Sequence, residues 1–92
     1  MIVIGEIDIY TAPQFESEVS KGYAAPGHVI VDLRSCRYID SSAITTLHRA
    51  NRQSGGKLRI VVDNDCNVKR ILDVTQIEKV VPVYSNVEDA RK

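Results

Sequence analysis

Short apolar runs alternate along this chain with longer segments whose apolar residues recur at helical spacing. The first run, Met1–Ile4, is long enough for a buried strand and ends at Gly5. Further strands are predicted by three later runs, at His28–Leu33, Lys57–Val62 and Val80–Tyr84. The earliest of these three is apolar at consecutive positions, which is typical of a strand covered on both faces.

The clearest predicted helix is Ser41–Ser54. Its apolar residues lie at the spacing of one helical face, and they are Ala43, Ile44, Leu47 and Ala50. Gly55-Gly56 follows, and glycine is the residue that most often ends a helix. The segment therefore predicts an amphipathic helix with one buried face.

An earlier helix is predicted to begin at Thr11. Its hydroxyl is a suitable cap, and Pro13 lies in the first turn, where its missing N–H costs little. The apolar stripe of this helix runs down to the break at Pro26-Gly27 and consists of Phe15, Val19 and Tyr23. Two shorter helical segments are marked by Val68, Ile71 and Leu72 and by Val87–Ala90.

The alternation of strands and helices predicts a mainly parallel α/β sheet with right-handed crossovers. Ninety-two residues supply one hydrophobic core, so we expect a single domain over residues 1–92.

The composition narrows the classes of partner. Lysine plus arginine equals aspartate plus glutamate at 12 each, so no overall field favours nucleic acid or an anionic membrane. No apolar run approaches the ~20 residues that span a bilayer. Cys36 and Cys66 form neither a C-x-x-C nor a zinc pattern, which predicts reduced, buried thiols, with a free surface thiol as the alternative. We therefore expect a cytoplasmic protein without direct nucleic-acid or membrane contacts.

The charges are nevertheless unevenly placed. Acidic residues predominate over positions 1–20 and basic residues over Arg34–Arg59, where Asp40 is the one acid. Such a distribution is expected either from scattered solvated faces or from a partner-facing patch.

The sequence offers little for catalysis. His28 and His48 have no cysteine or carboxylate at metal-ligand spacing, and no glycine-rich phosphate-binding loop occurs. We expect no catalytic residue, no metal and no cofactor. A small α/β enzyme or ligand carrier with a cleft near Asp8 and Asp40 is the rival function from another class.

The start of the central predicted helix is the most informative segment. Asp40 is placed as its N-cap, with the carboxylate accepting from the backbone N–H of Ser42 or Ala43. Ser41 is then the first helical residue, and its hydroxyl points outward. Because a helix N-terminus tolerates an anion, a phosphate there would add roughly two negative charges without unfolding the helix. Ser42, turned about 100° further round the axis, is the competing acceptor. From these residues alone, simple capping and a phosphorylation switch are both open.

An ordered set of short motifs runs from Gly5 to Ala90. The motifs are Gly5–Asp8, Ala12-Pro13, Val29–Leu33, Ile39–Ser42, Gly55–Leu58, Arg70–Thr75 and Val83–Ala90. This set resembles bacterial anti-sigma-factor antagonists of the STAS family, from their opening strand, through the serine-bearing helix start, to their closing strand and helix.

The resemblance implies both a fold and a function. The fold is a STAS-like mixed, mainly parallel sheet with helices packed on one side. Ser41 corresponds to the serine phosphorylated by a partner anti-sigma factor, which is a kinase with a histidine-kinase-like ATPase fold. Partner binding is implied for Asp8, Asp40, Ser41, Ser42 and Ala43. The unphosphorylated form binds the anti-sigma factor and releases sigma factor, and a serine phosphatase resets the switch. A non-switching STAS scaffold or sensor, of the stressosome or transporter-associated kind, is the alternative.

Three departures from the family pattern carry expectations of their own. Ala43 and Gln76 stand where members usually have glycine, so the C-cap at Gln76 is expected to be strained or altered. Members also usually carry another strand before the Gly5 segment, so the N-terminal strand is apparently shortened. The uncovered edge beside Ile2–Ile4 predicts a homodimer or a locally covered edge.

Overall fold

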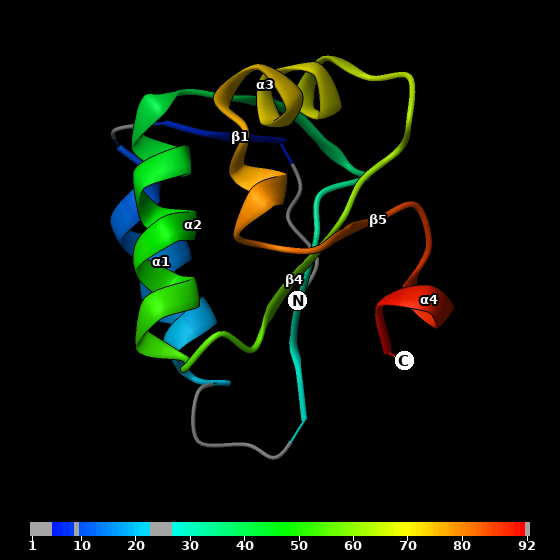
Figure 1. Cartoon of the computed structure of the whole chain (residues 1–92). Helices are drawn as coiled ribbons and strands as arrows, with labels where there is room; N and C mark the ends of the chain where they lie inside the picture. The colour runs from blue at the N-terminus through cyan, green and yellow to red at the C-terminus, as the bar shows by residue number, and fades with distance from the viewer. Residues whose placement is uncertain (1–4, 9, 23–26, 92) are drawn as a thin grey trace.

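The computed structural model describes residues 5–8, 10–22 and 27–91 (Figure 1). Strands and helices alternate in this part of the chain, in the order β1 (Gly5–Ile7), α1 (Ala12–Ser20), β2 (Val29–Asp32), β3 (Cys36–Ile39), α2 (Ser41–Gln53), β4 (Leu58–Val61), α3 (Asn67–Thr75), the 3-10 helix η1 (Ile77–Lys79), β5 (Val83–Tyr84) and α4 (Val87–Arg91). The strand predicted at Met1–Ile4, and with it the predicted dimer edge, lies outside the described residues.

All pairings between the described strands are parallel. β1 pairs with β3, and β4 lies between β2 and β5 in a second ladder. The register sets Ile7 opposite Ile39 in the first ladder and Val29 opposite Leu58 in the second. The predicted α/β fold with a mainly parallel sheet is confirmed.

The strand prediction needs correction at three places. The apolar pattern predicted neither β1 nor β3, and β3 has the exposed residues Arg37 and Tyr38 between its buried ends. The last predicted strand, Val80–Tyr84, is shortened to β5. The N–H of Val81 still donates to the carbonyl of Ile77 at 2.9 Å, so this residue continues the turn of η1.

Helix α1 is confirmed in place, but its start differs from the prediction. Thr11 is the N-cap residue by position, yet its side chain makes no capping hydrogen bond to the helix. Its Oγ1 instead accepts from the N–H of Asp8 at 2.9 Å. The helix ends at Ser20, and the predicted stripe residue Tyr23 lies outside the described residues.

Helix α2 matches its prediction closely. It spans Ser41–Gln53 and is followed by Gly55 and Gly56 at φ values of 74° and 83°. The Gly56 N–H donates back to the carbonyl of Asn51 at 2.8 Å, which satisfies one of the last carbonyls of the helix. Among the described residues, no helix combines the length and apolar composition needed to cross a bilayer.

Helices α1, α2 and α3 cover one face of the sheet. Leu58, Ile60 and Val62 lie at alternate positions along β4 and just beyond it, so their side chains share that face. All three are fully buried, and they join Phe15 of α1 and Leu47 of α2 in one core. The predicted apolar stripes of the helices are therefore the surfaces that pack on the sheet.

The last helix, α4, lies on the opposite face of the sheet from α1 and α2 (Figure 1). Arg59 and Val61 alternate with the core-facing residues of β4, so their side chains project to this second face. There the guanidinium of Arg59 donates to the carbonyl of Ala90 at 2.6 Å and lies 5.6 Å from the centre of the Tyr84 ring. Arg59 thereby holds α4 against the strands.

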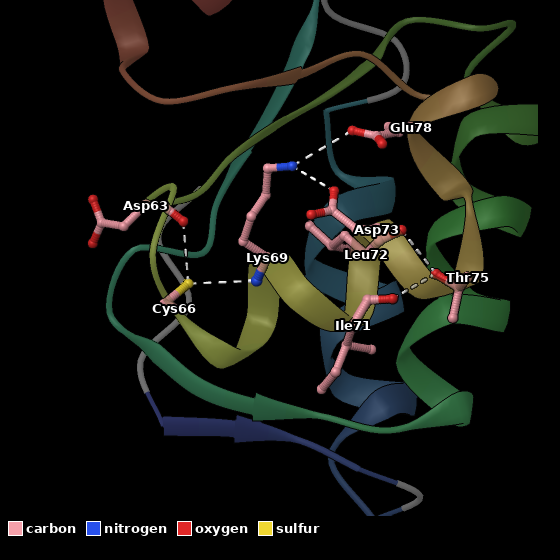
Figure 2. A network of polar contacts seen from close by, with 8 residues as sticks. All are labelled: Asp63, Cys66, Lys69, Ile71, Leu72, Asp73, Thr75 and Glu78. Atoms are coloured by element: carbon pink, nitrogen blue, oxygen red, sulfur yellow. Dashed lines mark hydrogen bonds and ion pairs between the residues drawn. The ribbon is translucent and has the colours of Figure 1, made fainter.

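The two cysteines have different environments. Cys36 is 5% exposed at the start of β3, as predicted for a buried thiol. Cys66 is partly exposed because it is the N-cap residue of α3. Its Sγ accepts from the N–H of Lys69 at 3.4 Å and donates to the carbonyl of Asp63 at 3.3 Å (Figure 2). The prediction of a buried thiol is therefore wrong for Cys66.

Gln76 ends α3 in left-handed backbone, at φ 61° and ψ 23°. Its N–H donates to the carbonyl of Asp73 at 3.2 Å. In the preceding turns the Nζ of Lys69 lies between the carboxylates of Asp73 and Glu78, as Figure 2 shows, and so links α3 to η1. A side chain in this backbone region is unfavourable, so the strained C-cap predicted at Gln76 is confirmed.

Gln76→Gly is expected to raise the free energy of unfolding by roughly 0.5–1 kcal/mol. Glycine adopts the left-handed region without a Cβ penalty, and this gain exceeds the extra freedom of glycine in the unfolded chain. Denaturant titration measures the change. Gln76→Ala is the matched control, because it shortens the side chain but keeps the Cβ. A glycine variant no more stable than the alanine variant would contradict the prediction.

Candidate functional site

Two strand ends converge to form the site. β1 and β3 are parallel neighbours, so their carboxyl ends lie at the same edge, and each is followed at once by an aspartate, Asp8 or Asp40. The N–H of Asp40 donates to the carbonyl of Ile7 at 3.2 Å. This bond joins the segment that begins α1 to the segment that begins α2.

Asp40 caps α2 as predicted. Its backbone is extended, at φ −117° and ψ −170°, and its Oδ1 accepts from the N–H of Ser42 at 2.8 Å and of Ala43 at 3.3 Å. These are two of the donors that a helix N-terminus leaves without partners inside the helix. The carboxylate of Asp40 therefore serves the fold of α2 before any partner is considered.

Asp40→Ala is expected to lower the free energy of unfolding by about 1 kcal/mol, because the N–H groups of Ser42 and Ala43 lose their acceptor. For a domain of this size that is a fall of roughly 4–8 °C in melting temperature. Asp40→Asn is the control, since its amide oxygen can still accept both bonds. Equal melting temperatures for the alanine variant and the wild type would show that the cap contributes nothing.

Ser41 is the first residue of α2 and its side chain is exposed. Within the described part of the chain its hydroxyl makes no hydrogen bond, so the oxygen is accessible to a modifying enzyme. Ser42 is only partly exposed. Ala43 is 0% exposed and belongs to the core. The methyl group of Ala43 faces the sheet and not the solvent, and the predicted contact of Ala43 with a partner stays a prediction.

Asp8 uses its carboxylate on the backbone. Its Oδ1 accepts from the N–H of Tyr10 at 2.9 Å and of Thr11 at 3.0 Å. The hydrogen bonds from Thr11 and Tyr10 hold the pKa of the Asp8 carboxyl below its ordinary value. The group is therefore ionised at neutral pH, and it shapes the turn that leads into α1.

A groove of about 350 Å³ runs between α1 and α2, which lie side by side in Figure 1. Ser41 lines this groove together with Pro13 of α1 and Thr45, one turn further along α2. Arg49 and Glu16 also line it, and they join the two helices by an ion pair of 2.7 Å. Ser41, the candidate phosphoacceptor, thus forms part of one wall of this groove, and the ion pair between Glu16 and Arg49 spans the groove.

The sequence reasoning did not identify Glu16, Thr45 or Arg49 as part of the site. A signal was present for two of them, because Ser41, Thr45 and Arg49 are spaced four residues apart and share one face of a helix. The contribution of Glu16 depends on how α1 packs against α2, and no spacing along the chain indicates it.

The basic residues between Arg34 and Arg59 do not form one patch. Arg34 pairs with Asp32 at 2.7 Å beyond the end of β2, and its guanidinium holds the pKa of the Asp32 carboxyl below the ordinary value. Arg49 pairs with Glu16 on the helical face, and Arg59 lies under α4 on the opposite face. Arg34, Arg49 and Arg59 therefore lie at three separate places on the fold, whereas a patch formed by other basic residues stays a prediction.

The site presents the exposed hydroxyl of Ser41. His28 and His48 are both exposed, and neither lines the groove. No group of three His, Cys, Asp or Glu side chains in the described ranges could hold a metal ion. The arrangement can accept a modification and present a surface, which are properties of a binding module.

Comparisons with known proteins bear directly on this arrangement. The family model of the STAS domain matches residues 2–90. An anti-sigma F factor antagonist of Paenibacillus polymyxa is 25% identical over 91 residues, which are 94% of this chain and 77% of that protein. A Thermotoga maritima protein named as an anti-sigma factor antagonist is 26% identical over 76 residues, 83% of this chain and 66% of the relative.

A solved structure agrees with these sequence matches. The crystal structure of an anti-sigma factor antagonist from Mycobacterium paratuberculosis has a TM-score of 0.85 to this chain at 26% identity, and the match covers 97% of this chain and 78% of the other. The family model and the structural match each span nearly the whole sequence. The chain belongs to the STAS domain family.

Proposed function

We propose that this protein is an anti-sigma-factor antagonist whose binding is switched off by phosphorylation of Ser41. The unphosphorylated form binds an anti-sigma factor that is also a serine kinase with a histidine-kinase-like ATPase fold, and the bound sigma factor is released. A serine phosphatase restores the binding form. The observation that carries the proposal is the exposed Ser41 hydroxyl at the first residue of α2, which lies beside the joined Asp8 and Asp40 segments.

The relatives support this choice among the functions of STAS domains. Both similar sequences and the similar crystal structure are named as anti-sigma factor antagonists. Such a protein needs no cofactor and no catalytic residue, and it acts in the cytoplasm, where sigma factors work. Its chemistry is limited to accepting the terminal phosphoryl group of ATP on the Ser41 oxygen, while the kinase supplies the nucleotide and the base that takes the hydroxyl proton.

The geometry around Ser41 supports a switch that leaves the fold unchanged. A phosphate there adds roughly two negative charges at a helix N-terminus, where an anion is tolerated. Asp40 already occupies the N–H groups of Ser42 and Ala43, so these donors are not available to draw the phosphate inward. The phosphate stays at the surface, in the mouth of the groove, where a bound partner would have to bury it.

The test is phosphorylation by the purified cognate kinase with Mg-ATP, followed by mass spectrometry of the modified peptide. We expect one phosphate, on Ser41, and no incorporation into Ser41→Ala. Ser42→Ala is the matched control and should be modified as the wild type is. Phosphate on Ser42 with Ser41 unmodified would overturn the site, and no modification at all would favour a non-switching STAS scaffold.

A further inference from the structure

Two aromatic side chains of the described residues are exposed to solvent. Tyr10 is 86% exposed and Tyr38 is 48% exposed, whereas Phe15 is buried in the core and Tyr84 lies beneath Arg59. Tyrosine has a large apolar ring with a polar tip, and it is enriched among the residues that dominate protein interfaces. A single exposed apolar side chain is normal on a protein surface, so what matters is where these two rings lie relative to Ser41.

Both tyrosines flank the phosphoacceptor. Tyr38 comes two residues before Asp40, and Tyr10 comes two residues after Asp8. The two aspartate segments are joined by the bond from the Asp40 N–H to the Ile7 carbonyl. Tyr38 is three residues from Ser41, so their Cα atoms lie within about 11 Å of each other. Tyr10 lies in the turn that leads into α1, the helix that forms the other wall of the groove.

The backbone that carries Tyr10 is held in place by Asp8. One carboxylate oxygen of Asp8 accepts from the N–H of Tyr10 and of Thr11, and the Thr11 hydroxyl accepts from the Asp8 N–H. These three bonds close a tight turn, although the Tyr10 ring itself is almost wholly in solvent. A ring presented on a preformed turn loses little backbone entropy when it becomes buried in an interface.

We infer that Tyr10 and Tyr38 are the aromatic anchors of the surface that binds the anti-sigma factor, and that Asp8 is a positioning residue for Tyr10. The inference rests on the proposed function. A stable interface covers about 800 Å² on each partner, which is a disc of roughly 16 Å radius. A kinase seated on Ser41 must therefore cover the flanking residues. On this inference Asp8 contributes to binding by holding the backbone of Tyr10, and not by contacting the partner through its charge.

The experiment measures the affinity of the purified anti-sigma kinase for the unphosphorylated chain by calorimetry. Tyr10→Ala and Tyr38→Ala are each expected to weaken binding by about 30-fold or more, the effect of removing an interface hot spot. The matched control is Val74→Ala, which removes an apolar side chain that is 77% exposed at the end of α3. It should bind within about twofold of the wild type. Because all three side chains are exposed, melting curves should coincide.

A second set of variants separates positioning from charge at Asp8. Asp8→Asn keeps an oxygen that can accept from the Tyr10 and Thr11 N–H groups, and it is expected to bind nearly as the wild type does. Asp8→Ala loses both bonds and should bind at least about fivefold more weakly, at a concentration where circular dichroism shows it folded. In the Tyr10→Ala background, Asp8→Ala should have no further effect, because a positioning residue acts only through the residue it holds.

The outcomes distinguish this inference from the function on which it rests. If the wild type binds the kinase and both tyrosine variants bind equally well, the anchor assignment is wrong and the proposed function stands. If Asp8→Asn is as weak as Asp8→Ala, the Asp8 carboxylate acts through its charge and the positioning role is wrong. If the wild type neither binds the kinase nor is phosphorylated by it, the proposed function fails and the anchors fail with it.

Discussion

Ser41→Asp is expected to weaken binding to the anti-sigma factor by about 3 kcal/mol, which is roughly a hundredfold in affinity. The hydroxyl of Ser41 is exposed at the mouth of the groove between α1 and α2, so a partner that covers it would bury the new carboxylate. Burying a charge without a partner costs several kcal/mol of binding free energy. Arg49 in the groove does little to offset this cost, because its guanidinium already forms an ion pair with Glu16. Calorimetry against the purified kinase measures the loss.

Ser41→Asn is the matched control, since asparagine has the size and shape of aspartate without its charge. We expect this variant to lose much less affinity than Ser41→Asp. The melting temperature of Ser41→Asp should stay close to that of the wild type, because a negative charge at an exposed helix N-terminus is neutral or mildly stabilising. Equal affinities for Ser41→Asp and the wild type would refute the charge switch. A large fall in melting temperature would instead place Ser41 inside the fold.

Leu47→Ala is expected to have the largest effect on stability, a loss of roughly 2–5 kcal/mol in the free energy of unfolding. Leu47 is 0% exposed and is the residue by which the middle of α2 packs into the core. A domain of this kind has only about 5–15 kcal/mol of stability in total, so the melting temperature should fall by roughly 10–25 °C. Thermal denaturation followed by circular dichroism measures the change.

Thr45→Ala is the matched control for this prediction. It shortens an exposed side chain of the same helix two residues away and should leave the melting temperature within a few degrees of the wild type. A Leu47→Ala variant as stable as Thr45→Ala would mean that α2 is held by its own helix propensity and not by packing. In that case the position of Ser41 at the start of α2 would not depend on the packing of Leu47.

The sequence by itself determined the elements whose signals are local. The start of α2 is an example. Asp40 accepts hydrogen bonds from N–H groups only two and three residues away, so the residues that form the cap are close together in the sequence. The apolar runs that became β2 and β4 are equally local, as is the periodic stripe of α2. The resemblance to the STAS family rested on short motifs spread from Gly5 to Ala90, and the family model confirmed it.

The prediction from the sequence was wrong at the start of α1, where the side chains of both Thr11 and Asp8 can accept backbone hydrogen bonds. Thr11 had the residue type and the position of a cap for α1, yet its hydroxyl bonds to the N–H of Asp8. The carboxylate of Asp8 meanwhile takes the N–H groups of the turn. Ala43, by contrast, lies in the core, as its place in the apolar stripe of α2 predicts.

Only the tertiary structure decided how the site is assembled. The ion pair between Glu16 and Arg49 joins residues 33 positions apart, and the meeting of the Asp8 and Asp40 segments depends on the parallel register of β1 and β3. β3 is only four residues long and has no regular apolar alternation, so its pairing with β1 could not be predicted from the sequence. Helix caps and periodic apolar stripes depend on residues that lie within one or two helical turns of each other. A single sequence therefore holds all the information needed to predict them. Register and helix docking depend on the simultaneous packing of distant segments, which becomes visible only when the chain is folded.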